Sequence, residues 1–445
     1  MVGSQAGHDA LNIWLVTVGE PLPGDHFSDG SERLLRAGVL AQRLTLAGHC
    51  VTWWTSCFDH ANRRYRRAPN SREMVSWSAQ DGRIPVEKEN VRSTACVFLG
   101  GTAYHGTVSP RRILHNITTA HHFNKQVQGQ KRPDLILTSM PTIELAEAAV
   151  LYGVRHDVPV VVDIRDLWPD LFETVMPVVL RPLLKPVLSY YHRKIARICS
   201  KATALTGNSP HFVQWGQRHG QRGDQAEDQW FPFGYQRALF SKEQGRAARD
   251  FWHAHGVTGR HFTIVFFGTM GRFAKLAPFV QLGDRLDNCA IQWVFCGDGP
   301  NRTVLMDSAQ DLAGQRVFPG WVSGTQIQVL MAMADMGIVP YENDPNYRDN
   351  LPNKPIEYLS GGVPILSSVD GYLGALIRQS GCGVVINPND LEVAAQQIRA
   401  YIADNDRQQD AKNGARALFE SQFNADRVYG QMQSWLENLA RPILR

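Results

Sequence analysis

Residues 11–56, "LNIWLVTVGEPLPGDHFSDGSERLLRAGVLAQRLTLAGHCVTWWTS", contain one strand–helix–strand unit. The apolar run at 11–18 has the length of a buried strand, and Gly19 ends it. Apolar residues recur on one helical face through 31–49, which begins with a serine that can cap the helix. A second apolar strand follows at 50–56. Two strands joined by a helix are parallel neighbours with a right-handed crossover, which indicates an α/β sheet.

The same alternation continues along both halves of the chain. The further strands that we expect cover 133–139, 158–164, 202–209, 261–270, 291–300, 316–322, 336–341 and 382–388. Helices are expected between them, including 142–153 and 183–199. Residues 60–130 show no clear period and receive no assignment. The pattern predicts an α/β fold of two doubly wound, Rossmann-like domains.

The length of the chain also favours two domains, because 445 residues exceed what a single core usually buries. The apolar periodicity lapses between 217 and 245, where polar residues and glycine dominate, so we expect a linker there. The predicted divisions are an N-terminal domain at 1–216, the linker at 217–245 and a C-terminal domain at 246–424. A last amphipathic helix within 425–445 is expected to pack back on the N-terminal domain.

The composition of the chain argues against several classes of protein. The net charge of +4 is mild, without the basic clustering of a nucleic-acid binder. Seven scattered cysteines without a CxxC pair indicate neither a zinc cluster nor a disulfide framework and fit a reducing compartment. No signal peptide and no membrane-spanning apolar run is recognisable. We therefore expect a cytoplasmic protein without metal or cofactor. The mixed basic and apolar helix at 183–199 suits either peripheral contact with an anionic membrane or a core-facing helix with a solvated basic side.

Ligands of doubly wound sheets bind beyond the carboxyl ends of the strands, so the residues that follow strands are the candidates for a site. Gly19 opens a glycine-containing loop that lets a ligand approach the backbone closely, or else is only a flexible connection. The loop lacks the GxGxxG spacing of a nicotinamide site. Arg165 and Asp166 follow the strand at 158–164. A carboxylate there can steady positive charge on a sugar carbon or take a proton, and the alternative is a buried Arg–Asp pair that locks a turn.

The strand at 261–270 is followed by "GTMGRFAKL" (268–276). Gly268 and Gly271 open the backbone, and Arg272 and Lys275 add two cations within one helical turn. Cations beside a glycine turn suit a diphosphate, although a solvated helix face has the same pattern.

The stretch "DNLPNKPIEYLSGGVPILSS" (349–368) predicts a short helix between a turn and a strand. Asn353 can cap this helix, and the Gly361–Gly362 pair ends it. Unpaired amides near 351–354, which include that of Lys354, would face an anion. Glu357, one turn into the helix, can accept hydrogen bonds from two ribose hydroxyls, or else only stabilises the helix N-terminus electrostatically.

The ordered set of these motifs resembles a known family. The segments "FFGTMGRFAKL", "FCGDGP", "VFPGWV" and "LPNKPIEYLSGGVPILSS" are similar to the C-terminal half of GT-B glycosyltransferases. The similarity points to the large retaining family with the acid-x7-Glu signature, in particular its bacterial members that assemble surface polysaccharides. "GHCVTWWTS" and "DIRDLWPD" look like the N-terminal half of those members. The resemblance spans nearly the whole chain except 60–130.

The resemblance implies two Rossmann-like domains that face each other across a cleft, with a nucleotide-diphosphate sugar held by the C-terminal domain and no metal. Glu357 would hold the ribose, while Arg272 and Lys275 would contact the diphosphate. The loop after Gly19 would close near the phosphates. Asp349 stands where the signature usually has its first glutamate.

The N-terminal motif also departs from the family. Arg165 and Asp166 replace the usual histidine–acid pair, and Asp166 is expected at the reaction centre. The remaining donor-binding candidates that we carry forward are Gly268, Gly271, Asn353 and Lys354.

The function predicted in this way is the transfer of a sugar from a nucleotide-diphosphate sugar to a glycan or lipid-linked acceptor. Two alternatives stay open: a nucleotide-sugar 2-epimerase of the same fold, and a non-catalytic nucleotide-sugar-binding partner of a polysaccharide-assembly complex. They differ in turnover, because an epimerase needs no acceptor and a binding partner forms no product.

Overall fold

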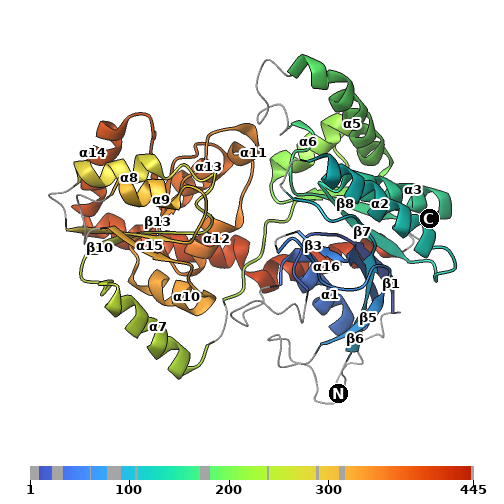
Figure 1. The fold of residues 1–445 in the computed structure, drawn as a ribbon, viewed down its shortest axis with the longest axis horizontal. Coiled ribbons are helices and arrows are strands. Elements are labelled where there is room, and N and C mark those ends of the chain that lie inside the picture. The colour runs from blue at the N-terminus through green and yellow to red at the C-terminus, as the bar shows by residue number, and fades with distance from the viewer. Residues whose placement is uncertain are drawn as a thin grey trace. The chain divides into compact units, whose positions relative to one another are not determined.

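The computed structural model describes residues 10–22, 34–60, 62–77, 92–105, 109–170, 181–237, 240–286, 290–309 and 316–441, without the side chains of 181–184. The chain divides into two compact units (Figure 1). The first comprises Met1–Phe231 together with Tyr429–Arg445, and the second comprises Pro232–Val428. Each unit is built around one main sheet.

The first unit contains a seven-stranded sheet with the order β5-β6-β2-β1-β7-β8-β9. Its strands are β1 (Asn12–Val16), β2 (Cys50–Ser56), β5 (Arg72–Trp77), β6 (Arg92–Leu99), β7 (Leu135–Met140), β8 (Val160–Ile164) and β9 (Ala204–Gly207). All neighbours are parallel except β5 and β6, which are antiparallel. A separate small hairpin joins β3 (Phe58–Asp59) to β4 (Arg64–Tyr65). The predicted strand–helix–strand start is confirmed, since Ile13 pairs with Val51 in a parallel register.

The helices of this unit are α1 (Arg36–Leu46), α2 (Pro110–Gln126), α3 (Ile143–His156), α5 (Arg181–Lys201) and α6 (Pro210–Gly220), joined by most of α16 (Ala425–Ala440). The expected helix start at Ser31 lies outside the described residues. Two contacts hold α16 within the unit: Trp435 Nε1 donates to the Glu227 carbonyl at 3.1 Å, and Glu437 lies 3.0 Å from His49 Nε2.

Residues 60–130, which the sequence pattern left unassigned, supply β4, β5, β6 and α2. Helix α2 begins where Ser109 Oγ accepts the Arg112 amide and Pro110 occupies the first turn. The segment expected to be a linker is shorter than predicted, because residues 217–220 complete α6 and residues 242–245 begin α7 (Lys242–Ala254). Both helices have polar outer faces, which hid their apolar period.

The second unit contains a six-stranded sheet with the order β12-β11-β10-β13-β14-β15, in which all pairs are parallel. Its strands are β10 (Phe262–Phe267), β11 (Ile291–Cys296), β12 (Arg316–Gly320), β13 (Met336–Val339), β14 (Ile365–Ser367) and β15 (Gly383–Val385). With α7, its helices are α8 (Ala277–Arg285), α9 (Arg302–Asp307), α10 (Gly324–Met333), α11 (Pro345–Arg348), α12 (Asn353–Ser360), α13 (Tyr372–Ser380), α14 (Leu391–Ile402) and α15 (Asn405–Leu418).

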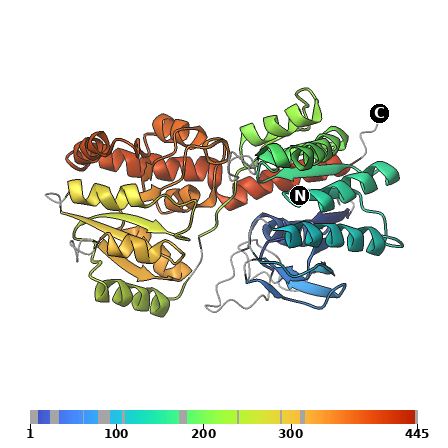
Figure 2. The same ribbon diagram turned by 45° about the horizontal axis from the view of Figure 1, so that its top comes forward.

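Alternate residues of β10 feed two different hydrophobic clusters. Val265 and Phe267 pack with residues of α7 and α10, whereas Ile264 and Phe266 pack with residues of α8 and α14. The two pairs of helices accordingly lie on opposite sides of the sheet (Figure 2). A parallel sheet covered on both faces is the doubly wound arrangement that the sequence predicted. Among the described helices, none is long and apolar enough to cross a bilayer.

Candidate functional site

The loops that follow β10 and β11 pack backbone against backbone at the carboxyl edge of the second sheet. The Met270 amide donates to the Asp298 carbonyl at 2.8 Å, and the Asn301 amide donates to the Met270 carbonyl at 3.0 Å. Gly297 has a φ of 125°, and a Cβ there would overlap the Gly268 carbonyl oxygen. Glycine is therefore required at 297 both by conformation and by space. Gly268 and Gly271 lie in the first of these loops, as predicted.

Lys354 enters this site from α12. Its ammonium donates to the Phe267 carbonyl and lies 4.6 Å from the centre of the Phe266 ring. Gly268 makes the approach possible, because a Cβ at that position would overlap Lys354 Nζ. Burial lowers the pKa of Lys354 to about 8, despite the nearby negative charge of Glu357. A buried cation thus lies against the glycine loop at the carboxyl end of β10.

Glu357 is half-buried one turn further along α12. Burial and the charge of Glu357 raise the pKa of Tyr341 to about 12, so the carboxylate also faces the end of β13. The helix ends at Gly361 as predicted, but the capping role of Asn353 is wrong: Pro352 holds the N-cap position and no side chain caps the helix. Pro355 explains this, because it removes one of the N–H groups that a capping Asn353 would accept.

The remaining candidates of the second unit lie further out. Lys275 Nζ is 2.9 Å from Glu342 Oε1, and both side chains are exposed to solvent. The Lys275 amide donates to the Pro340 carbonyl at 2.6 Å, which ties its loop to the end of β13. Arg272 is exposed in the same loop. Asp349 accepts from Arg348 through both carboxylate oxygens, at 3.0 and 3.3 Å.

In the first unit, a buried ion cluster holds the end of β8. Asp163 is fully buried and accepts from Arg36 and Arg165, each at 2.7 Å. Burial alone raises the pKa of Asp163, but the two guanidinium charges outweigh burial and hold that pKa below its usual value. Arg165 also pairs with Glu20, whose other oxygen accepts the Ala37 amide at 2.9 Å. The described surroundings of Arg165 thus match the alternative interpretation of a pair that locks a turn.

Asp166, at the carboxyl edge of the first sheet, has a raised pKa. Burial raises its pKa to about 6, although the positive charges of Arg112 and Arg165 oppose the shift. The guanidinium of Arg112 lies 4.8 Å above the Trp168 ring, and so it lies beside the segment that carries Asp166. Arg165 Nη2 is buried and has no hydrogen-bond partner among the residues that the structure describes.

A group of hydrogen-bonded rings adjoins Arg112. His60 Nδ1 lies 2.8 Å from the Tyr104 hydroxyl with the rings stacked, and His115 Nδ1 donates to the Thr102 carbonyl at 2.7 Å. Burial and the charge of Arg112 lower the pKa of both histidines, which keeps them neutral near pH 7. His60 lies beyond the carboxyl end of β2 and Tyr104 lies beyond that of β6, so both share the carboxyl edge of this sheet with Asp166.

Close packing, by contrast, does not require a glycine at position 19. Gly19 follows β1 with a φ of 84°, and the space around its Cβ position is open. The loop beyond residue 22 lies outside the described part of the chain.

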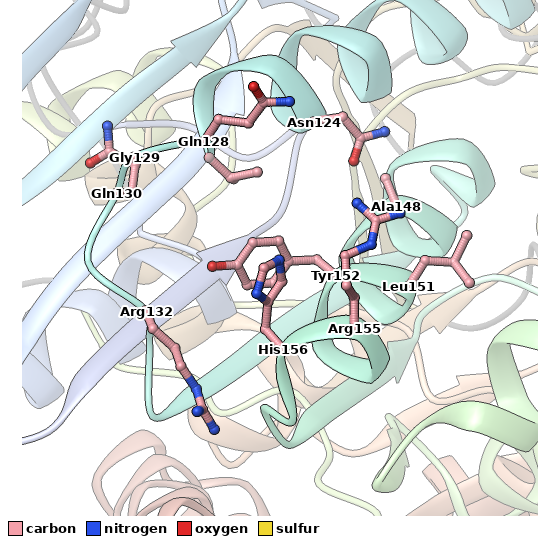
Figure 3. A pocket seen from close by; sticks show the side chains of 11 residues that line it. Asn124, Gln128, Gly129, Gln130, Arg132, Ala148, Leu151, Tyr152, Arg155 and His156 are labelled. Carbon is pink, nitrogen blue, oxygen red and sulfur yellow. The ribbon is translucent and has the colours of Figure 1, made fainter.

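The structure also contains a pocket of about 460 Å³ away from these candidates (Figure 3). Its walls come from the ends of α2 and α3, with Asn124, Tyr152, Arg155 and His156 among the lining side chains. Helix α2 leads into β7 and helix α3 leads into β8. The ends of both helices therefore lie near the amino ends of these strands, and so does the pocket. None of the predicted site residues lines it.

Comparison with known protein families gives a match within the second unit. Residues 256–418, which contain the glycine loops and α12, match the family described as glycosyl transferases group 1. The whole chain has the GT-B fold. No curated protein sequence matches the chain.

Solved structures resemble this chain over almost its whole length. Sucrose-phosphate synthase from Thermosynechococcus elongatus is 16% identical with a TM-score of 0.67, and the match covers 96% of this chain and 99% of that one. HepE from Anabaena, in complex with UDP, is 15% identical with a TM-score of 0.63, covering 96% and 100%. WaaG, a glycosyltransferase involved in lipopolysaccharide biosynthesis, is 14% identical with a TM-score of 0.58, covering 96% and 99%.

Sequence reasoning missed several residues of this site. Glu20, Arg36 and Asp163 form the ion cluster with Arg165, and Arg112 lies beside Asp166. The one usable signal was a charged residue, Asp163, inside an otherwise apolar strand, since a buried carboxylate requires a cationic partner.

The glycine contact gives a direct test of the site's packing. Gly297→Ala is expected to lower the unfolding free energy of the second unit by about 3 kcal/mol or more, because the new Cβ meets the Gly268 carbonyl and the backbone conformation is strained. Gly324→Ala is the matched control, since its Cβ would meet nothing within 4 Å. Denaturant titration followed by circular dichroism measures both. Equal midpoints for Gly297→Ala and the unchanged protein would contradict the contact.

Proposed function

We propose that the protein transfers a sugar from a nucleotide-diphosphate sugar to a glycan or lipid-linked acceptor, with retention of the anomeric configuration, in bacterial surface-polysaccharide synthesis. The observation that carries the proposal is the group 1 match over 256–418, the segment in which the glycine loops, Lys354 and Glu357 converge. The involvement of WaaG in lipopolysaccharide biosynthesis, as its description states, supports the choice of pathway.

The donor would bind at the carboxyl edge of the second sheet. The amides of the loop at 268–271 and the cations Arg272, Lys275 and Lys354 suit a diphosphate that gains charge as the sugar leaves. A bound anion would stabilise the charged form of Lys354 and raise its pKa, which burial lowers to about 8. Glu357 would accept the ribose hydroxyls. HepE is described with UDP and with UDP-glucose, which makes a uridine nucleotide the first donor to test.

Asp349, Asn353 and Gly19 are proposed as secondary donor contacts. Asp349 is held by Arg348, so its carboxylate is oriented but already paired. Asn353, as the first residue of α12, offers its side-chain amide rather than a cap. Gly19 offers an open backbone position in the first unit.

The acceptor would bind at the carboxyl edge of the first sheet. Asp166 has a pKa of about 6. Its carboxylate is therefore ionised at neutral pH, and its pKa lies near enough to that pH for it to accept a proton as a general base. Arg165, beside Asp166, is proposed as a further residue of the reaction centre, and its Nη2 is buried without a described partner. The neutral rings of His60 and Tyr104 suit sugar hydroxyls.

A lipid-linked acceptor fits the surface of α5. Val187 and Tyr190 are exposed, at 47% and 49% of their full surface, beside the exposed basic residues Lys185 and Arg193. Apolar and basic side chains together are typical of peripheral contact with an anionic membrane. We therefore place the enzyme in the cytoplasm, at the inner face of the plasma membrane.

Turnover with and without acceptor tests the proposal. Purified protein is incubated with UDP-glucose and a panel of other nucleotide sugars, with or without a lipid-linked glycan extract, and the released nucleoside diphosphate is quantified. Release that requires the extract is expected, and the proton NMR spectrum of the product should show the donor's anomeric configuration. Conversion of the sugar without acceptor would indicate an epimerase instead, and binding without turnover would indicate a non-catalytic partner.

Glu357→Ala is expected to raise the donor KM at least about 10-fold, because a charge-assisted hydrogen bond to a hydroxyl is lost. The acceptor KM should stay unchanged. Glu392→Ala removes an exposed glutamate of α14 and is the control. Initial rates over a range of donor concentrations give both constants, and wild-type kinetics in the Glu357 variant would remove this residue from the donor site.

Asp166 predicts a particular pH dependence. Because its folded pKa is about 6, the ionised fraction is high at pH 7 and falls as the pH drops through 6. The acceptor-dependent rate should fall with it. Asp166→Asn should lower the rate about 100-fold or more and abolish this acidic limb. Asp410→Asn, on the exposed face of α15, should keep both the rate and the limb. An unchanged pH profile in the Asp166 variant would contradict the assignment.

A further inference from the structure

Two histidines and an aspartate converge in the first unit, outside the residues assigned above. We propose that Asp170, His192 and His219 bind one divalent transition-metal ion such as Zn²⁺. Asp170 belongs to the segment after β8, His192 to α5 and His219 to α6. One ligand atom from each side chain lies within 4.8 Å of the other two. The sequence pattern did not predict this group, because its three members are more than 20 residues apart in the chain.

The spacing of the three side chains suits an ion between them. His192 Nδ1 lies 3.7 Å and His219 Nε2 lies 4.0 Å from the same oxygen, Asp170 Oδ1. Both distances are too long for a hydrogen bond. Metal bonds of about 2.0–2.2 Å in a tetrahedral site separate the ligand atoms by about 3.3–3.6 Å. Small side-chain rotations therefore convert this arrangement into a coordination site.

The tautomer of His219 is fixed in the state that a metal needs. Its Nδ1 lies 3.0 Å from the Trp215 carbonyl oxygen. A carbonyl can only accept, so Nδ1 carries the hydrogen and Nε2 keeps its lone pair on the side of Asp170. Metal-binding histidines usually donate their second ring nitrogen to such a partner, which orients the ring and strengthens the ligand.

Trp215 orients Asp170 as well. Its indole Nε1 donates to Asp170 Oδ2 at 2.7 Å, which leaves Oδ1 available for coordination. Trp215 is buried, so one fixed residue supports two of the three ligands. The His192 and His219 rings stack at 5.6 Å with an interplanar angle of 11°, so the third ligand is also held in place.

The ligand set selects the kind of ion. Two imidazoles and one carboxylate favour Zn²⁺ and related transition metals over Mg²⁺ and Ca²⁺, which prefer oxygen ligands. Three protein ligands leave a fourth position for water. The side chains are 21–41% exposed, so an ion reaches them from solvent.

The site would act as a clamp on the segment that carries Asp166. Asp170 follows Asp166 by four residues, and an ion would tie this segment to both α5 and α6. Metal binding by these three residues does not depend on the proposed glycosyl transfer.

Metal binding by the full chain tests the proposal. The protein is stripped with a chelator, and Zn²⁺ binding is measured by isothermal titration calorimetry and by equilibrium dialysis. One ion per chain is expected, with an unfolding temperature that rises with Zn²⁺ concentration and not with Mg²⁺. His192→Gln, His219→Gln and Asp170→Asn should each weaken this binding at least about 10-fold. His253→Gln, an exposed histidine of α7, should leave it unchanged.

Two further measurements separate this site from adventitious binding. Trp215→Phe removes the indole donor but keeps the ring and the carbonyl, and it should weaken Zn²⁺ binding about 10-fold. Co²⁺ should give visible bands without a thiolate charge-transfer band, which excludes the exposed Cys50 as the ligand. The proposal would be overturned if the protein did not bind one equivalent of Zn²⁺, or if Co²⁺ gave a thiolate band. It would also be overturned if all three ligand variants bound Zn²⁺ as tightly as the unchanged protein.

Discussion

The contact between Gly297 and the carbonyl of Gly268 is the constraint on which the site of the second unit depends. Parallel strands deliver their loops to one edge of the sheet, and these two loops meet there without room for a side chain. The same absence of side chains lets Lys354 reach the carbonyl of Phe267. Backbone amides and a buried cation are therefore brought together by steric necessity rather than by specific side-chain pairing.

The first unit organises its edge by charge instead. Asp163 is buried between Arg36 and Arg165, and Arg165 reaches on to Glu20. Removing one partner of such a cluster leaves a buried charge uncompensated, which typically costs several kcal/mol. The cluster joins the end of β8 to the start of α1, and so it fixes the backbone from which Asp166 projects.

The sequence predicted what depends on local periodicity. The strand–helix alternation, the doubly wound sheets and the glycine loops were all visible, and so was the end of α12 at Gly361, because each is set by neighbouring residues. Pairings across long separations were not visible. Arg36 and Asp163 are 127 positions apart, and nothing local distinguishes their pairing from any other. The capping role of Asn353 failed for a different reason, because Pro352 and Pro355 shift the start of the helix by one residue.

The two candidate edges share one electrostatic property. Burial disfavours the charged form of both Lys354 and Asp166. The pKa of Lys354 falls to about 8, and that of Asp166 rises to about 6. In each case the neighbouring opposite charge offsets only part of the desolvation cost. A group in this state is stabilised by any ligand that supplies the missing countercharge or hydrogen bond. Lys354 thereby favours an anion and Asp166 favours a hydroxyl donor or developing positive charge, which is the pairing that a phosphorylated sugar donor and a hydroxyl acceptor would supply.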